Sequence, residues 1–143
     1  MRIDYLDTSA WVKQFLRYEP GSQRMDALWN DAPAVATSDL ARVEMLSTLA
    51  RRIGRGQVDL AEYRRVRSSF LAAWDTVRVV PLTPELLERA GYLAEVHFLR
   101  GADAIHFASV LPLRPAVRLV AADAELLEAA QAVGVPTVDP SSP

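Results

Sequence analysis

The chain has 143 residues, half of them hydrophobic, and a formal net charge of −2. This length and apolar content suit one domain with a substantial core, and the small negative charge argues against indiscriminate binding to polyanions. The absence of cysteine excludes disulfide scaffolds, thiolate zinc sites and cysteine nucleophiles. We predict a single domain over residues 1–139 and a short tail over residues 140–143.

The first apolar stretch of the chain contains two acids, Asp4 and Asp7, which is unlike a secretory signal. No apolar run in the sequence approaches the length of a membrane span. We therefore expect a cytoplasmic protein that does not associate with a membrane.

The first half of the chain alternates short strand-like runs with helical patterns. In chain order, it predicts a strand, two helices, a second strand and two longer helices, over residues 2–6, 10–18, 22–30, 34–37, 40–53 and 59–75. Thr8 and Ser9 are the expected caps of the first helix, and Ser38 or Asp39 is the expected cap of the helix that begins at residue 40.

The second half continues the alternation. It predicts a strand, two helices, a strand, a helix and a last short strand, over residues 77–82, 86–99, 102–111, 116–121, 123–133 and 136–138. Thr83 and Pro84 mark the start of the first of these helices. Strands that alternate with helices, without hairpin turns, indicate a parallel sheet with helices on both faces. We therefore predict an α/β fold with four or five short strands.

Four acids lie far apart in the sequence, and each falls at the end of a predicted strand or near the start of a predicted helix: Asp7, Glu44, Asp103 and Asp123. Ligands of open α/β sheets bind at the carboxyl ends of the strands, where Asp7 and Asp123 are expected on adjacent strands. Carboxylates gathered there repel one another, and a divalent cation such as Mg²⁺ or Mn²⁺ removes the conflict. Because a bound cation can activate a water molecule, the four acids predict a metal-dependent enzyme that acts on phosphate esters.

Each acid also has a purely structural interpretation. The two acids that follow strands could cap the helices after them, and Asp103 could complement a helix dipole. Glu44 could be a solvated acid paired with Arg51 or Thr48. The joint pattern of four acids favours the metal site over four separate structural explanations.

Two further polar residues lie close to these acids in the sequence. Asp4 shares a strand with Asp7, but a spacing of three puts it on the opposite face, which favours a structural role. His106 follows Asp103 by three positions and lies on a similar helix face. It could donate a hydrogen bond behind the metal ligands or contact substrate, or it could be a partly buried histidine of the helix.

Four segments around the acids resemble the PIN-domain ribonucleases and, among them, the VapC toxins of bacterial toxin–antitoxin pairs. They are YLDTSA at residues 5–10, SDLARVE at 38–44, GADAIHFA at 101–108 and AADAELL at 121–127. The resemblance spans nearly the whole chain and implies a PIN-like, three-layer α/β/α sandwich with a short central parallel sheet. It also implies an endoribonuclease toxin of a VapBC-type pair that hydrolyses RNA phosphodiesters with a metal-activated water.

The resemblance implies roles for individual residues. The acidic set corresponds to Asp7, Glu44, Asp103 and Asp123. Asp7 and Asp103 would be the principal ligands of Mg²⁺ or Mn²⁺, and Thr8 or Ser9 would be the hydroxyl beside the first acid. Many members carry Thr or Ser two residues before the last acid, where this chain has Ala121. Two partners are also implied, a VapB-type antitoxin and a second copy of the chain in a homodimer.

The segment from residue 51 to residue 67 holds six arginines against two acids, a local basic excess in an acidic chain. Its first three arginines, Arg51, Arg52 and Arg55, are candidates for binding RNA phosphates. The alternative is a solvated helical hairpin whose arginines pair with neighbouring acids.

Two rival functions remain open from the sequence. A phosphatase of the haloacid-dehalogenase type also has an Asp after its first strand, but it needs a second Asp two residues later, where this chain has Ser9. A PIN-like domain whose acids have failed could serve as a binding module without catalysis. Binding of Mn²⁺ separates the catalytic hypothesis from the binding module.

Overall fold

Five parallel strands form the centre of the fold in the computed structural model, which describes residues 1–142. The strands are β1 (Ile3–Leu6), β2 (Ala34–Ser38), β3 (Arg78–Val80), β4 (Val117–Val120) and β5 (Thr137–Val138). Their order in the sheet is β3-β2-β1-β4-β5, and every neighbouring pair is parallel. The predicted parallel α/β sheet is confirmed, although the strand predicted over residues 77–82 is shorter because Pro81 follows its last residue. Pro143, the end of the predicted tail, lies outside the described residues.

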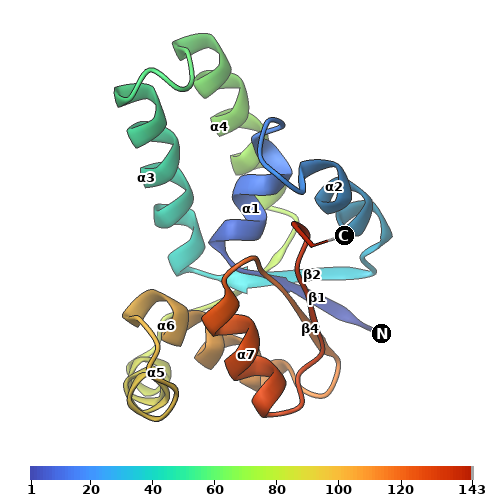
Figure 1. The fold of residues 1–143 in the computed structure, drawn as a ribbon, viewed down its shortest axis with the longest axis vertical. Coiled ribbons are helices and arrows are strands. Elements are labelled where there is room, and N and C mark those ends of the chain that lie inside the picture. Colours follow the sequence, from blue (N-terminus) through green and yellow to red (C-terminus); the bar gives the residue numbers. More distant parts are fainter. Residues whose placement is uncertain (143) are drawn as a thin grey trace.

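Helices cover both faces of this sheet and complete a three-layer α/β/α sandwich (Figure 1). Above the sheet in Figure 1 lie α1 (Thr8–Phe15), α2 (Ser22–Asp31), α3 (Leu40–Gly54) and α4 (Leu60–Trp74). Below it lie α5 (Pro84–His97), α6 (Gly101–Val110) and α7 (Ala124–Ala132), with a 3₁₀ turn at Leu111–Leu113 after α6. The joined ends of α3 and α4 point away from the sheet as a helical hairpin. In residues 1–142, no helix is both long and apolar enough to cross a membrane.

Aspartates cap several of these helices, and one cap differs from the prediction. Thr8 and Ser9 were expected to cap α1, but both lie inside the helix, and Asp7 is the N-cap that accepts the Ala10 N–H at 3.1 Å. That prediction is wrong because the carboxylate one residue earlier already reaches the free N–H groups of the first turn. The same helix ends at Phe15, earlier than the predicted residue 18.

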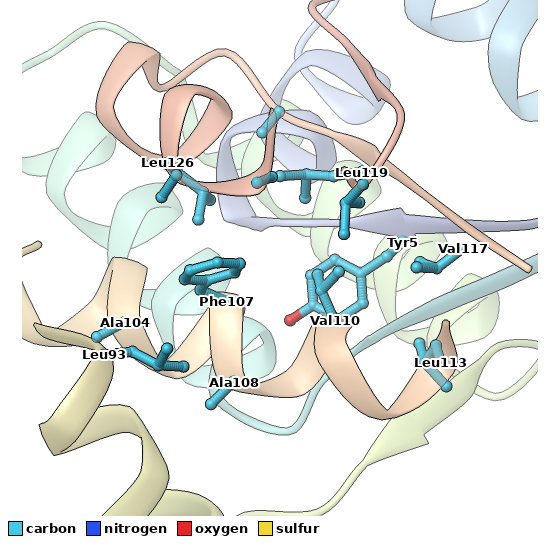
Figure 2. Close-up of a cluster of buried hydrophobic side chains, with 14 of the residues drawn as sticks. Tyr5, Leu93, Ala104, Phe107, Ala108, Val110, Leu113, Val117, Leu119 and Leu126 are labelled. Atoms are coloured by element: carbon cyan, nitrogen blue, oxygen red, sulfur yellow. The ribbon is translucent and has the colours of Figure 1, made fainter. Parts of the chain in front are cut away.

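Each face of the sheet has its own hydrophobic core, because successive side chains of a strand point to opposite faces. Tyr5 of β1 lies in the core between the sheet and α5, α6 and α7, and Figure 2 shows its ring beside Phe107 and Val110 of α6. Leu6, the next residue, packs instead with α1, α3 and α4 around Trp11. Both cores run up to the carboxyl end of β1, so the residues that follow it sit on a rigid base.

Candidate functional site

The carboxyl edge of the sheet gathers the acids that the sequence singled out. Asp7 directly follows β1, and Asp123 lies three residues beyond β4, which pairs with β1 in parallel. Asp103 belongs to the first turn of α6, and Glu44 lies near the start of α3. The expectation that Asp7 and Asp123 end adjacent strands at one edge is confirmed.

Asp7 is a buried acid, with 4% of its surface exposed. Its Oδ1 accepts hydrogen bonds from the Ser9 hydroxyl at 2.6 Å and from the Ala10 N–H at 3.1 Å. Burial raises the pKa of the Asp7 carboxyl; the nearby His106 and the two hydrogen bonds act in the opposite direction, and the negative charge of Asp123 adds to the rise. The folded chain therefore disfavours the ionised form of Asp7.

The pKa of Asp103 is also raised. Burial raises its pKa to about 6 from an ordinary value of 3.8, and the negative charges of Asp123 and Asp7 add to the rise. The three carboxylates are therefore within electrostatic reach of one another. Of the ion pairs within residues 1–142, none involves any of the three.

The two acids that follow strands combine capping with an open coordination position. Asp123 caps α7 by accepting the Leu126 N–H on Oδ1 at 2.9 Å, as Asp7 caps α1 through its own Oδ1. The hydrogen bonds that both carboxylates accept within the described part of the chain end on Oδ1. Each cap therefore leaves Oδ2 available to a ligand, so the capping and metal-binding interpretations are compatible.

Glu44 is held by two donors at a single oxygen. The Thr8 hydroxyl donates to its Oε1 at 2.6 Å, and His106 Nε2 lies 3.0 Å from the same oxygen. Burial acts to raise the pKa of Glu44, but the hydrogen bonds from His106 and Thr8 outweigh it and lower the pKa. The structural alternative of a pair between the Glu44 and Thr48 side chains is wrong, because the Thr48 hydroxyl donates to the Glu44 backbone carbonyl at 2.9 Å.

The two hydroxyls beside the first acid serve different carboxylates. Thr8 binds Glu44, whereas Ser9 donates to Asp7 and accepts the Ala122 N–H at 3.0 Å. Ser9 thereby ties the end of β1 to the segment that carries Asp123. Ala121, two residues before Asp123, is fully buried beside this contact.

Tyr5 is the residue of this region that the sequence reasoning missed. Its hydroxyl lies 2.8 Å from Nδ1 of His106, on the side of the ring opposite Glu44. A buried tyrosine generally needs a hydrogen-bond partner. This is the only signal in the sequence that could have identified Tyr5 as part of the site. His106 itself, 2% exposed, joins Tyr5 and Glu44 and is far more buried than a surface histidine.

The three candidate arginines of α3 and its C-terminal end fall into different surroundings. Arg51 lines a surface hollow of about 300 Å³ with Thr8, Glu44 and Ser47. Arg52 pairs instead with Glu19, and its guanidinium also donates to the Tyr18 hydroxyl at 3.0 Å. Arg55 is exposed at the C-cap of α3. Only Arg51 of the three lies beside the acidic site.

The carboxylates suit a cation such as Mg²⁺, which binds few protein ligands, better than a metal ion that is surrounded by protein ligands alone. Among residues 1 to 142, no group of three or more His, Asp or Glu side chains is arranged to hold a metal ion by itself. Mg²⁺ typically takes one or two carboxylates and completes its shell with water and substrate oxygens. Asp7 and Asp103 would offer two such carboxylates, and a bound cation would relieve their mutual repulsion.

Comparison with known proteins decides the family. A family model described as PIN domain matches residues 5–132, nearly the whole chain. The chain belongs to the PIN-domain family. Within this family it groups with the VapC ribonucleases: it is 38% identical over 138 residues to ribonuclease VapC49 of Mycobacterium tuberculosis, covering 94% of this chain and 93% of that protein. Ribonuclease VapC47 of the same species is 31% identical over 144 residues, covering 96% of this chain and 97% of that protein.

Solved structures of the PIN-domain family have the same fold. The crystal structure of Mycobacterium tuberculosis VapC20, described as a toxin that cleaves the sarcin–ricin loop, matches with a TM-score of 0.71 and 25% identity. The match covers 92% of this chain and 95% of that one. FitAB bound to a DNA fragment matches with a TM-score of 0.74 and 17% identity, covering 98% of this chain and 96% of that one. At that identity the second match shows the fold alone.

Proposed function

We propose that this chain is a metal-dependent endoribonuclease and the toxin of a VapBC-type toxin–antitoxin pair. The observation that carries the proposal is the cluster of Asp7, Asp103 and Asp123 at one sheet edge, with raised pKa values for Asp7 and Asp103. No ion pair within residues 1–142 neutralises the three acids, and the chain belongs to the VapC group. This combination favours hydrolysis over a binding module, which has no need for uncompensated acids.

Asp7 and Asp103 are the proposed ligands of Mg²⁺ or Mn²⁺, with Asp123 beside them. When bound, the cation supplies a water activated for attack and stabilises the charge that develops on the phosphate. The protein supplies orientation: the Ser9 hydroxyl and the Ala10 N–H fix Oδ1 of Asp7, and Oδ2 would remain free to bind the cation. Preorganised groups of this kind lower the barrier because they need not rearrange during the reaction.

Glu44 is the proposed proton acceptor or water ligand of the site. Its lowered pKa keeps the carboxylate ionised at neutral pH. The hydrogen bonds from Thr8 and His106 both end on Oε1, which leaves Oε2 free to accept a hydrogen bond or a proton from water. A general base must lie within hydrogen-bond reach of the water it deprotonates, and the position of Glu44 at the edge of the site suits that role.

Arg51 is the proposed contact for an RNA phosphate next to the cleaved one. It follows Glu44 by seven residues, or about 10 Å along the helix axis, and lines the same hollow together with Ser47. Arg51→Ala should raise KM about fivefold with little change in kcat, because a phosphate contact that binds substrate and transition state equally changes KM. Arg64→Ala is the matched control, since this exposed arginine of α4 does not line the hollow. Equal KM values for both variants would remove Arg51 from the RNA path.

A VapB-type antitoxin and a second copy of the chain are the proposed partners. The VapC group supports the antitoxin, and partly exposed Phe15, Leu28 and Trp29 on α1 and α2 offer apolar surface for a partner helix. Co-expression with a small DNA-binding protein encoded beside the gene should yield a stable complex without ribonuclease activity. Sedimentation of the isolated chain should give twice the monomer mass of 15.8 kDa.

Cleavage of cellular RNA tests the proposed activity directly. Total RNA, including intact ribosomes because VapC20 is described as cleaving the sarcin–ricin loop, would be incubated with the protein and Mg²⁺ or Mn²⁺, and new 5′ ends mapped. We expect discrete cuts that disappear with EDTA and in Asp103→Asn. RNA binding without any cut in either metal would favour the binding module instead.

A further inference from the structure

A buried hydrogen-bond chain runs from the core of the protein to Glu44. Tyr5 of β1 is fully buried, and Figure 2 shows its ring reaching from the strand toward α6. Its hydroxyl lies 2.8 Å from Nδ1 of His106, and the two rings meet edge to face with their centres 5.9 Å apart. The other ring nitrogen of His106, Nε2, lies 3.0 Å from Oε1 of Glu44.

For a neutral imidazole, the direction of one of these hydrogen bonds determines the direction of the other. A tyrosine phenol carries its proton at neutral pH and can donate it to an acceptor. A neutral imidazole has one nitrogen that donates and one that accepts. If Nδ1 accepts from Tyr5, the ring proton must sit on Nε2, where it faces the carboxylate of Glu44.

We propose that Tyr5 and His106 are positioning residues for Glu44: the phenol donates to Nδ1, and the Nε2–H that results donates to Oε1. The Thr8 hydroxyl donates to the same oxygen at 2.6 Å. With both donors on Oε1, the carboxylate cannot rotate freely, and Oε2 remains free of these two donors. The importance of this pair for catalysis rests on the proposed function, whereas the tautomer of His106 does not.

The alternative is that Tyr5 and His106 only fill the core between the sheet and α6. In that case the packing of the rings matters and the direction of the hydrogen bonds does not. Partners that orient a ligating or catalytic group typically affect activity by about 10–100-fold when they are removed. The two explanations therefore differ in what happens when the Tyr5 hydroxyl alone is deleted.

Nitrogen NMR of the metal-free protein tests the tautomer without RNA or metal. The chain has two histidines, His97 and His106, so labelling with ¹⁵N-histidine gives two ring systems, and His97→Gln assigns them. We expect His106 to have an unprotonated Nδ1 and a protonated Nε2. In Tyr5→Phe the His106 signals should shift toward a mixture of tautomers while those of His97 stay unchanged. A proton on Nδ1 in the native protein, or an unchanged His106 spectrum in Tyr5→Phe, would overturn the proposal.

Kinetics then test whether the orientation of Glu44 matters. Tyr5→Phe should lower kcat about 10–100-fold and leave KM within about twofold, since uniform substrate binding is untouched. His106→Gln places an amide N–H near the position of Nε2, whereas the shorter Asn does not reach Glu44, so Gln should retain about tenfold more activity than Asn. Equal activities of the Gln and Asn variants, with circular dichroism showing both folded, would indicate core filling instead. A native protein that cleaves no RNA would contradict the proposed function but leave the NMR result standing.

Discussion

Two buried aspartates three residues apart, Asp4 in β1 and Asp7 just after it, have opposite surroundings. Asp4 is 1% exposed and receives two hydrogen bonds from Arg118, at 3.0 and 2.9 Å, and two from Arg2, at 2.9 and 3.4 Å. Asp7 is 4% exposed, and its charged neighbours include the acids Asp103 and Asp123. One carboxylate is neutralised by the protein, and the other is crowded by more negative charge.

The difference shows how burial separates structural acids from functional ones. A charge removed from water is tolerated only when it is paired or coordinates a metal. Asp4 has its counter-charges built into the chain, since Arg118 lies directly opposite it in the register of β1 and β4. Asp7 has no ion-pair partner within residues 1–142, and its raised pKa supports our proposal that a bound cation supplies the counter-charge.

Exchange of the Asp7 carboxylate for an amide should have the largest effect on RNA cleavage. Asp7→Asn is expected to lower RNA cleavage about a thousandfold or more, equivalent to about 4 kcal/mol of transition-state stabilisation. Asn is also a good helix cap, so the free energy of unfolding should stay within about 1 kcal/mol of the native value. Single-turnover cleavage and chemical denaturation measure the two quantities on one preparation. Full activity in this variant would remove Asp7 from the site.

The matched change at Asp4 should lower the free energy of unfolding and leave the rate of RNA cleavage unchanged. Asp4→Asn leaves Arg118 and Arg2 without their shared counter-ion, and loss of one partner of a buried pair destabilises a protein by about 3–5 kcal/mol. Because both arginines reach solvent in part, we expect about 2–3 kcal/mol here. Urea denaturation measures it, and the cleavage rate at a temperature where the variant is folded serves as the control. A stable but inactive Asp4→Asn protein would reverse the assigned roles.

The sequence could predict that these two acids lie on opposite faces of the strand, but it could not predict their partners. A spacing of three on a strand was enough to put Asp4 and Asp7 on opposite faces. The pairing of Asp4 with Arg118 depends on which strands are neighbours and in what register, and local patterns contain neither piece of information. The same limit applies to Tyr5 and His106, which are 101 residues apart and meet only when α6 packs under β1.

Helices and strands were predictable because their signals are local, and the exceptions have local causes. Prolines, glycines and apolar periodicity located nearly every element, whereas the cap of α1 depended on which of several adjacent polar side chains reached the free N–H groups. The separation of Arg51 from Arg52 required the structure, since adjacent residues of one helix face different neighbours. The site residues themselves were predictable as a set only because the topology of parallel sheets brings strand ends together.

Added metal should stabilise the folded chain through Asp7 and leave the contribution of Asp4 unchanged. A ligand that binds only the folded state stabilises it by about 1.4 kcal/mol when its free concentration is ten times its Kd. We therefore expect Mn²⁺ to raise the midpoint of thermal unfolding of the native protein and of Asp4→Asn, but not of Asp7→Asn. Sodium chloride at the same ionic strength is the control for screening by salt. An equal rise in all three proteins would indicate binding of Mn²⁺ elsewhere.

The smallest effect should come from Asp103, and its sign depends on pH and metal. Because burial and the neighbouring carboxylates raise its pKa from 3.8 to about 6, the folded chain binds this proton more tightly than the unfolded chain. The ionised carboxylate therefore destabilises the metal-free fold above about pH 6, and the penalty disappears below the ordinary pKa, where both states are protonated.

Asp103→Asn should thus be more stable than the native protein without metal at pH 7.5, by about 1 kcal/mol or less because the carboxyl is partly solvent-screened. The difference should shrink at pH 5, as the native carboxyl takes up its proton. Saturating Mg²⁺ should reverse the order, since only the native protein gains the full binding free energy. Denaturation of both proteins at the two pH values, with and without Mg²⁺, measures all four differences. A variant that is less stable in every condition would mean that the Asp103 carboxylate serves the fold and that repulsion among the acids is minor.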